Sequence, residues 1–206
     1  MKQKNKKIII SAIIALTIIL GIVVINVWGF YKELRYAESQ RIDIYVEQTV
    51  DAKKIKDIAN EVLGLHNMVQ VVEVYEDMVT IRAKTISEEQ KNNIVNKVKE
   101  IYQFEQTAEK TDINKVPETR IRDMYKQYII PFAISGILVL IYMLIRYYNK
   151  GILKVLLNVI LIPIIAELLL LSWMAIVRIP IGRFTPSLVI LVYVASVWYT
   201  MKQIEK

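Results

Sequence analysis

Hydrophobic positions dominate four stretches of the chain. The first, residues 8–30, contains no charged side chain and directly follows four lysines at positions 2, 4, 6 and 7. Three further apolar stretches lie at 128–147, 155–177 and 185–201. A hydrocarbon core of about 30 Å requires about 20 apolar helical residues. The pattern therefore predicts an integral membrane protein with four transmembrane helices.

The first stretch is predicted to be a retained anchor rather than a cleaved signal peptide. Its apolar part is longer than the roughly 7 to 15 residues of a signal-peptide core, and no small-x-small cleavage site follows it. Trp28 and Tyr31 are then expected at the outer membrane–water interface, where aromatic side chains are enriched.

The segment between the first two spans, residues 31–127, has the periodicities of a small α+β domain. Apolar and polar positions alternate over 42–46, which predicts a strand with one buried face. Asp51 is placed to cap a helix that Gly64 ends, and the apolar residues between them recur at helical spacing.

The second half of this segment is predicted to form a β-hairpin followed by a second helix. A valine-rich stretch at 68–75, a tight turn at Glu76-Asp77 and an alternating stretch at 79–83 predict a β-hairpin. Ser87 and Gln90 have capping-box spacing at the start of a second amphipathic helix.

We expect a short final strand at 104–107. The resulting β-α-β-β-α order favours a ferredoxin-like sandwich, with two helices on one face of an antiparallel sheet. After Val116-Pro117, apolar and basic positions separate onto two helical faces, which predicts a short interfacial helix leading into span two. A plain polar linker is the alternative.

The net charge of +7 reports membrane topology rather than a nucleic-acid partner. Residues 31–127 hold 16 basic and 18 acidic side chains, so the domain is nearly neutral. Nine basic residues lie in the tails and in the loop between spans two and three, against two, Arg178 and Arg183, in the next loop. The positive-inside rule therefore predicts that both termini are cytoplasmic and that residues 31–127 are extracytoplasmic.

The composition argues against several classes of site. The chain has no cysteine, which excludes thiol catalysis, and its lone histidine, His66, argues against a zinc site. There is no glycine-rich phosphate loop and no nucleophile elbow. We therefore expect no enzymatic activity, no cofactor and no metal, and a domain that works by contact with a partner.

Glu167 is the only acidic residue inside the predicted spans. An ionised carboxylate at that depth costs about 2.5 to 3.5 kcal/mol, so it must be protonated, paired or facing a wet interior. Pro163 stands one turn earlier and removes an amide donor, which predicts a kink and a free carbonyl near the acid. The pattern leaves open whether Glu167 is functional or structural.

Span four has a polar stripe. Tyr193, Ser196, Thr200 and Gln203 are spaced to lie on one helical face, which predicts that this face meets protein rather than lipid. The stripe either meets Glu167 or makes ordinary interhelical hydrogen bonds.

Several short segments resemble one family. They are Arg41–Glu47, Val50–Ile55, Val69–Tyr75, Val79–Arg82, Ser87–Gln90, Pro117-Glu118, Ile141-Tyr142, Arg146-Tyr147 and Ala166-Glu167. With the order of spans and domain, they resemble the SecF/SecD family, membrane subunits that assist the bacterial Sec protein translocase. The last pair falls where that family commonly has His-Asp in its third span.

The chain also departs from the family pattern. The family's D-F-x-G-G signature is absent at 37–40, and its G-Y-S-x-N-D-T segment is absent from span four, where Ser196 falls near the position of the aspartate. Two later spans of the family have no counterpart in this sequence. We therefore do not expect a complete proton-driven cycle from this chain alone.

Three functions follow as expectations. The resemblance implies a divergent, truncated SecF-like subunit that assists protein export, with a SecD-like chain, the Sec channel, exported polypeptide and lipid as partners. A cell-envelope assembly or scaffold protein is the alternative, and ion-coupled transport through Glu167 is a third. The predicted regions are a tail with the first span (1–30), the extracytoplasmic domain with its juxtamembrane helix (31–127) and a three-helix bundle (128–206).

Overall fold

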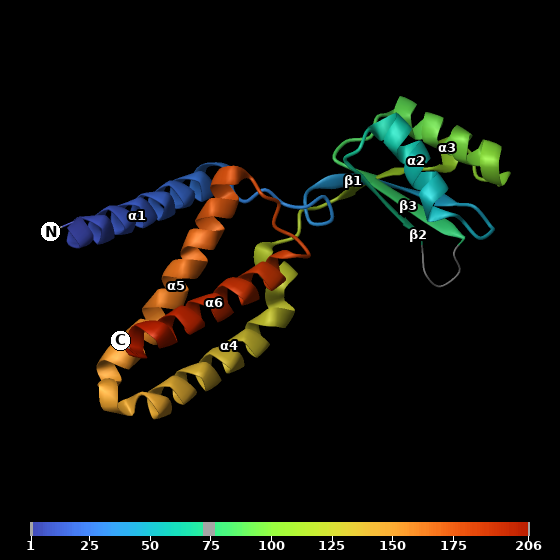
Figure 1. Cartoon of the computed structure of the whole chain (residues 1–206). Coiled ribbons are helices and arrows are strands. Elements are labelled where there is room, and N and C mark those ends of the chain that lie inside the picture. The colour runs from blue at the N-terminus through green and yellow to red at the C-terminus, as the bar shows by residue number, and fades with distance from the viewer. Residues whose placement is uncertain (1, 72–76, 206) are drawn as a thin grey trace. The chain divides into compact units, whose positions relative to one another are not determined.

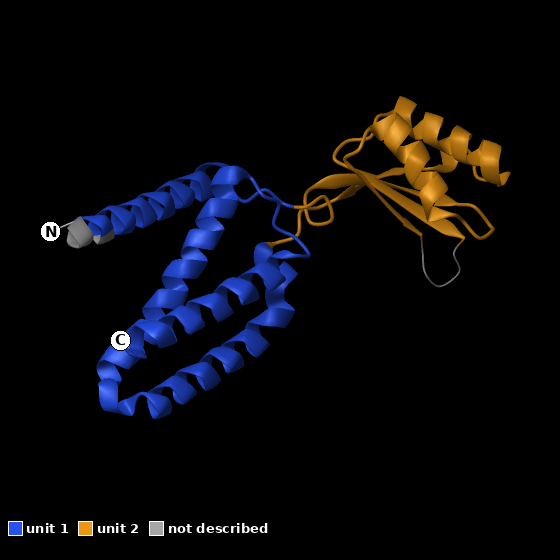
Figure 2. Ribbon diagram, in the orientation of Figure 1, with its two compact units in different colours: residues 1–32, 121–206 blue, residues 33–120 orange. Residues whose placement is uncertain are grey.

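The computed structural model describes residues 2–71 and 77–205. The chain divides into two compact units, which are coloured separately in Figure 2. The membrane unit comprises the residues up to Lys32 and those from Ile121 onward, and the α+β domain comprises Glu33–Arg120.

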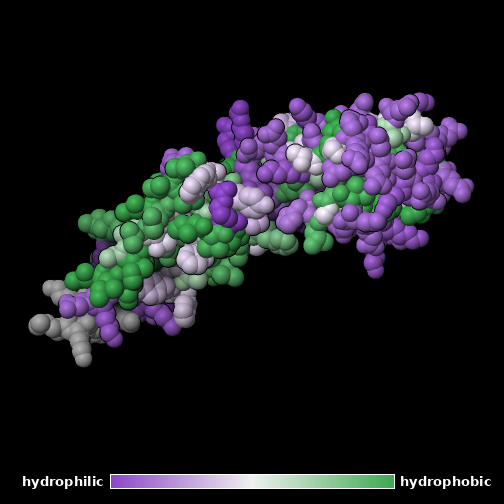
Figure 3. Space-filling model, turned by 90° about the horizontal axis from the view of Figure 1, so that it is seen from above, coloured by the Kyte–Doolittle hydropathy of each residue, from purple (hydrophilic) through white to green (hydrophobic). Residues whose placement is uncertain are grey.

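Within the described residues, four helices are long and apolar enough to cross a membrane, which confirms the predicted number of spans. They are α1 (Lys2–Trp28), α4 (Ile121–Arg146), α5 (Ile152–Val177) and α6 (Thr185–Glu205). Large apolar side chains are exposed along all four helices, and Figure 3 shows this apolar surface on the membrane unit. Such a surface is expected of helices that face lipid.

Helix α4 is longer than the predicted second span. Residues 121–127 form its first turns, so the segment predicted as a separate interfacial helix is continuous with the span. The short 3₁₀ helix η2 (Tyr148–Lys150) then turns the chain into α5.

Helix α5 packs against both α1 and α6. Its contact with α1 is close at Gly21, because a Cβ atom added there would lie 2.2 Å from the Cβ of Ser172. Small residues at such crossings allow transmembrane helices to approach backbone to backbone. At the other end of α5, a buried cluster joins α4, α5 and α6 through Met143, Tyr147, Val155, Val159 and Ile204.

The α+β domain contains a four-stranded antiparallel sheet among its described residues. Its elements are β1 (Ser39–Tyr45), α2 (Ala52–Leu63), β2 (Asn67–Val71), β3 (Met78–Ala83), α3 (Glu88–Tyr102), the 3₁₀ helix η1 (Ala108–Lys110) and β4 (Ile113–Val116). The strand order is β2-β3-β1-β4, and Figure 1 shows both helices on one side of the sheet. This is the βαββαβ arrangement of a ferredoxin-like fold, as predicted.

The core of the domain lies between the sheet and the two helices. Strands β1 and β3 turn alternate residues inward, and Ile42, Ile44 and Ile81 have no exposed surface. The apolar stripes of α2 and α3 pack onto them through residues such as Ile55 and Ile94. Burial of these side chains drives the folding of a domain that has no disulfide.

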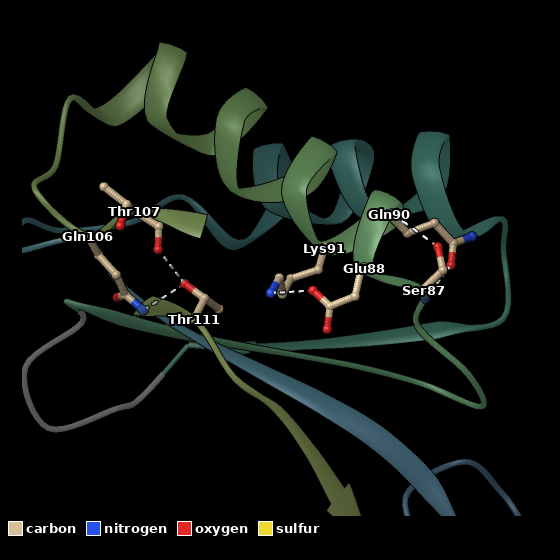
Figure 4. Close-up of polar contacts among 7 residues, drawn as sticks. All are labelled: Ser87, Glu88, Gln90, Lys91, Gln106, Thr107 and Thr111. Atoms are coloured by element: carbon tan, nitrogen blue, oxygen red, sulfur yellow. Dashed lines mark hydrogen bonds and ion pairs between the residues drawn. The ribbon is translucent and has the colours of Figure 1, made fainter. Parts of the chain in front are cut away.

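The predicted helix ends are confirmed. Asp51 accepts a hydrogen bond from the Lys53 amide at the start of α2, and Gly64 ends that helix with a φ of 77°. Ser87 and Gln90 form a reciprocal capping box at the start of α3, shown in Figure 4. These caps satisfy amides that have no partner inside the helix.

The predicted final strand at 104–107 is wrong, because the fourth strand lies at Ile113–Val116. Phe104 instead enters the core, and the Gln106 side chain bonds the backbone of β1 beyond the end of β4. Its amide oxygen accepts from the Tyr45 amide at 2.7 Å, and its nitrogen donates to the Asp43 carbonyl at 3.3 Å. A single side chain thus replaces the backbone pairing that was predicted for this segment.

The Gln106 nitrogen also donates to the buried hydroxyl of Thr111, which donates to the Thr107 carbonyl (Figure 4). In the hairpin, the strand predicted at 68–75 is observed over Asn67–Val71, and residues 72–75 lie outside the described residues. The predicted turn at Glu76-Asp77 also falls partly outside them.

Candidate functional site

The predicted polar stripe of α6 contains two buried hydroxyl groups, and both bond within the helix. Ser196 and Thr200 are 6% and 1% exposed, so they face protein. The Ser196 hydroxyl donates to the Tyr193 carbonyl at 2.6 Å, and the Thr200 hydroxyl donates to the Ser196 carbonyl at 2.8 Å. This pattern satisfies hydroxyl groups in apolar surroundings and leaves them little capacity to bind a ligand.

Tyr193 and Gln203 have different surroundings. The ring of Tyr193 packs against Phe132 of α4, with ring centroids 5.0 Å apart. Gln203 is exposed and donates to the hydroxyl of Tyr199 at 2.7 Å. None of the hydrogen bonds of this stripe among the described residues reaches Glu167.

Glu167 lies inside α5, one turn after Pro163, which interrupts the hydrogen bonding of a continuous helix. Both of its carboxylate oxygens are buried, and neither has a hydrogen-bond partner among the described residues. A buried carboxylate without a partner is costly in an apolar setting. Among the described residues, Glu167 therefore makes no hydrogen bond to Tyr193, Ser196 or Thr200, and the four residues do not form one hydrogen-bonded site.

An apolar cavity of about 720 Å³ lies in the membrane unit between α4 and α6. Its wall is mostly aliphatic and aromatic, and includes Phe132, Val139, Leu171 and Tyr193. Glu167 is not among the residues that line it. The cavity therefore offers apolar contact and no convergent charged groups.

The segment after α1 holds the loop between α5 and α6. The Ile181 amide donates to the Tyr31 carbonyl at 2.8 Å, and the Arg178 guanidinium donates to the Gly29 carbonyl at 3.0 Å. Arg178 also stacks over the Tyr31 ring at 5.8 Å. The hydroxyl of Tyr125 joins α4 to this group by donating to Gly182 at 3.2 Å. Sequence reasoning assigned Tyr31 only to the membrane interface and missed this junction.

In the α+β domain, the helices cover one face of the sheet, and the opposite face is here called the open face. Strand alternation and register place on it Arg41, Asp43 and Tyr45 of β1, Met78, Thr80 and Arg82 of β3, Met68 of β2 and Asn114 of β4. This side of the domain was predicted only as a solvated surface.

Two arginines meet on the open face. Arg41 and Arg82 are directly opposite each other in the antiparallel pairing of β1 with β3. Like charges at such positions repel each other, because the Cβ atoms of facing residues lie about 5 Å apart. Arg35 adds a third guanidinium, and its carbonyl accepts a hydrogen bond from Arg82 at 2.9 Å.

The pKa of the Arg82 guanidinium is lowered, first by burial and then by the charges of Arg41 and Arg35. The carboxylate of Asp43 opposes this shift, and it pairs with Arg41 at 3.0 Å. Asp43 also accepts from the Thr80 hydroxyl at 2.8 Å. Asp43 therefore pairs with Arg41 and acts electrostatically on Arg82.

Three buried donors of this cluster make no hydrogen bond among the described residues. They are the Nε atoms of Arg41 and Arg82 and the hydroxyl of Ser39, which is 2% exposed. The Arg41 Nε atom still forms the ion pair with Asp43. At the other end of β1, Tyr45 is 47% exposed, and its pKa is raised by a hydrogen bond to Asp77. The open face thus has a basic end, around Arg41 and Arg82, and a neutral-to-acidic end, around Tyr45 and Asp77.

The remaining charged clusters of the domain are satisfied internally. Lys56 donates to the carbonyl and side-chain oxygens of Asn67, and burial lowers its pKa. Lys91 of α3 is buried and forms an ion pair with Glu88 of the same helix (Figure 4), with the two charged atoms 2.5 Å apart. His66 is exposed in the turn after α2, and no cluster of three or more metal-binding side chains occurs among the described residues.

Comparison of the chain with protein-family models, curated proteins and solved structures gives no significant match.

Proposed function

We propose that this chain is a SecF-like accessory membrane subunit, which assists the translocation of exported polypeptides through contacts of its α+β domain. The observation that carries the proposal is the place of a ferredoxin-like domain between α1 and three further membrane helices. This order of parts resembles the SecF/SecD family, and the short motifs of β1, α2 and β3 resemble it as well.

The distribution of basic residues supports the orientation that this function requires. The tails and the loop between α4 and α5 are rich in lysine and arginine, and the loop between α5 and α6 has two basic residues. Positive charge is retained on the cytoplasmic side during insertion. In the proposed topology both termini are cytoplasmic, and the α+β domain meets polypeptides outside the cytoplasm.

The proposal assigns the activity to binding rather than to chemistry. The buried hydroxyls of Ser196 and Thr200 bond within α6, whereas the open sheet face of the domain carries the facing pair Arg41 and Arg82. A SecD-like chain and the Sec channel are the proposed partners in the membrane.

Co-purification tests this proposal. A tagged chain, extracted in mild detergent, is expected to enrich translocase subunits over a tagged control membrane protein of similar abundance. Enrichment of other envelope proteins without any translocase subunit contradicts the proposal and favours an envelope scaffold.

A further inference from the structure

We propose that the open face of the sheet binds an acidic segment of polypeptide, whose carboxylate pairs with Arg41 and Arg82. The inference concerns the chemistry of the bound segment. Its identification as part of an exported chain rests on the proposed function.

The charges on the open face favour a carboxylate as the ligand. Arg41 and Arg82 face each other across β1 and β3, with Arg35 beside them and Asp43 as their acidic partner. Facing like charges destabilise a sheet, so the pair is costly to the free domain. A ligand carboxylate relieves this repulsion, and the planar guanidinium fork is suited to hold it with two parallel hydrogen bonds.

Arg41 is partly accessible, and its neighbourhood contains donors without partners. The Arg41 side chain is 40% exposed, although its Nε atom is buried. Beside it, the Nε atom of Arg82 is buried and has no hydrogen-bond partner among the described residues, so a ligand reaches it only after the Arg82 side chain turns outward. Asn114 of β4 is exposed and lies opposite Arg41 in the pairing of β1 with β4, which adds an amide to the same row. Arg82, Arg41 and Asn114 thus form one row across three neighbouring strands at this end of the face.

The side chains around the arginine pair favour a polypeptide over a lipid headgroup or free phosphate. Met68 lies opposite Arg82 on β2, and Met78 lies opposite Tyr45 four residues along β1 from Arg41. Tyrosine, methionine and arginine are enriched at protein interfaces, and flexible methionines let one surface accept varied sequences. Four strand residues span about 13 Å, which is the length of a short extended peptide.

Peptide binding by the purified full chain in zwitterionic nanodiscs tests the inference. The probe is a fluorescein-labelled flexible peptide with two adjacent aspartates, and its neutral twin has asparagines instead. Fluorescence anisotropy is expected to show binding of the acidic peptide at least about tenfold tighter than that of the twin. Added salt is expected to weaken the binding, because the contact is between charges.

Variants locate the site. Arg41→Gln and Arg82→Gln are each expected to weaken binding about tenfold or more. Lys54→Gln removes the same charge from an exposed position on α2, on the covered side of the sheet, and is expected to change binding less than about twofold. Circular dichroism on each variant establishes that the domain is folded, and Arg82→Lys, which keeps the charge but loses the fork, provides a second folded test with intermediate binding.

Equal binding of the two peptides, or equal losses in the arginine and Lys54 variants, overturns the inference. Displacement of the peptide by soluble phosphatidylglycerol or inorganic phosphate at lower concentration than by free acidic peptide also overturns it, and assigns the arginines to phosphate. The peptide-binding measurement is independent of the co-purification test. Peptide binding without translocase enrichment overturns only the proposed function, and enrichment without peptide binding overturns only this inference.

Discussion

At the level of single residues, Gly21 sets how closely α1 can approach α5. An added Cβ atom would lie 2.5 Å from the Ser172 Cα, which is backbone and cannot rotate away. Gly136 in α4 has more room, since its nearest neighbour would be the Tyr193 hydroxyl at 3.8 Å. The two glycines therefore differ in what they tolerate, although both lie in membrane helices.

Gly21→Ala is expected to destabilise the membrane unit by about 1 to 3 kcal/mol, because it overpacks the α1–α5 contact. Gly136→Ala is the matched control and is expected to leave stability unchanged or slightly higher, since alanine favours the helix. Thermal unfolding in detergent measures both. Equal unfolding temperatures for the two variants contradict the close contact.

Gln106 is a second residue with a large structural role. Its amide group satisfies the Tyr45 amide and the Asp43 carbonyl at the part of β1 that β4 does not reach. A backbone group that loses such a partner is left unsatisfied, which costs free energy. The size of this cost depends on how deeply the group is buried.

Gln106→Ala is expected to lower the free energy of unfolding of the domain by about 1 to 3 kcal/mol and to speed hydrogen exchange at the Tyr45 amide. Gln70→Ala is the control, because Gln70 is exposed on β2 and a surface change there costs about 0.5 kcal/mol or less. Exchange measured by mass spectrometry tests this, and unchanged exchange at Tyr45 rules out the proposed role.

At the level of elements, local signals in the sequence were sufficient for most of the fold. Helix ends were predictable because Asp51, Ser87 and Gly64 act on amides and backbone angles within a few residues. Strands with one buried face were predictable from alternation, and spans from length and hydropathy.

The elements that were missed depend on distant contacts. Strand β4 has only four residues and pairs with β1, which lies far away in sequence, and the Gln106 side chain takes the place predicted for the strand. The arginine pair of the open face arises only from the register of β1 with β3. No local pattern in the sequence encodes such a register. The sequence therefore predicted Arg41 and Arg82 only as solvated surface charges.

Glu167 of α5 is not expected to take part in the proposed function. Because the proposed activity lies in the domain, Glu167→Gln is expected to leave membrane insertion, abundance and the rate of export unchanged. Export of a reporter protein in cells that depend on the variant chain provides the measurement. Loss of export at normal abundance contradicts this expectation and favours ion coupling through Glu167, whose buried carboxylate has no hydrogen-bond partner in the part of the chain that the structure describes.

At the level of the whole molecule, the proposed function depends on the side of the membrane on which the α+β domain lies. The chain has no cysteine, so a single introduced cysteine reports its own position without further changes. Lys54 on α2 and Asn149 in the turn between α4 and α5 are both exposed positions suited to this purpose.

Labelling of intact cells with a membrane-impermeant maleimide measures directly on which side of the membrane the α+β domain lies. Lys54→Cys is expected to react in intact cells, and Asn149→Cys is expected to react only after the membrane is permeabilised. Reaction of Asn149→Cys in intact cells, with Lys54→Cys protected, would place the domain in the cytoplasm and contradict the proposed role in export.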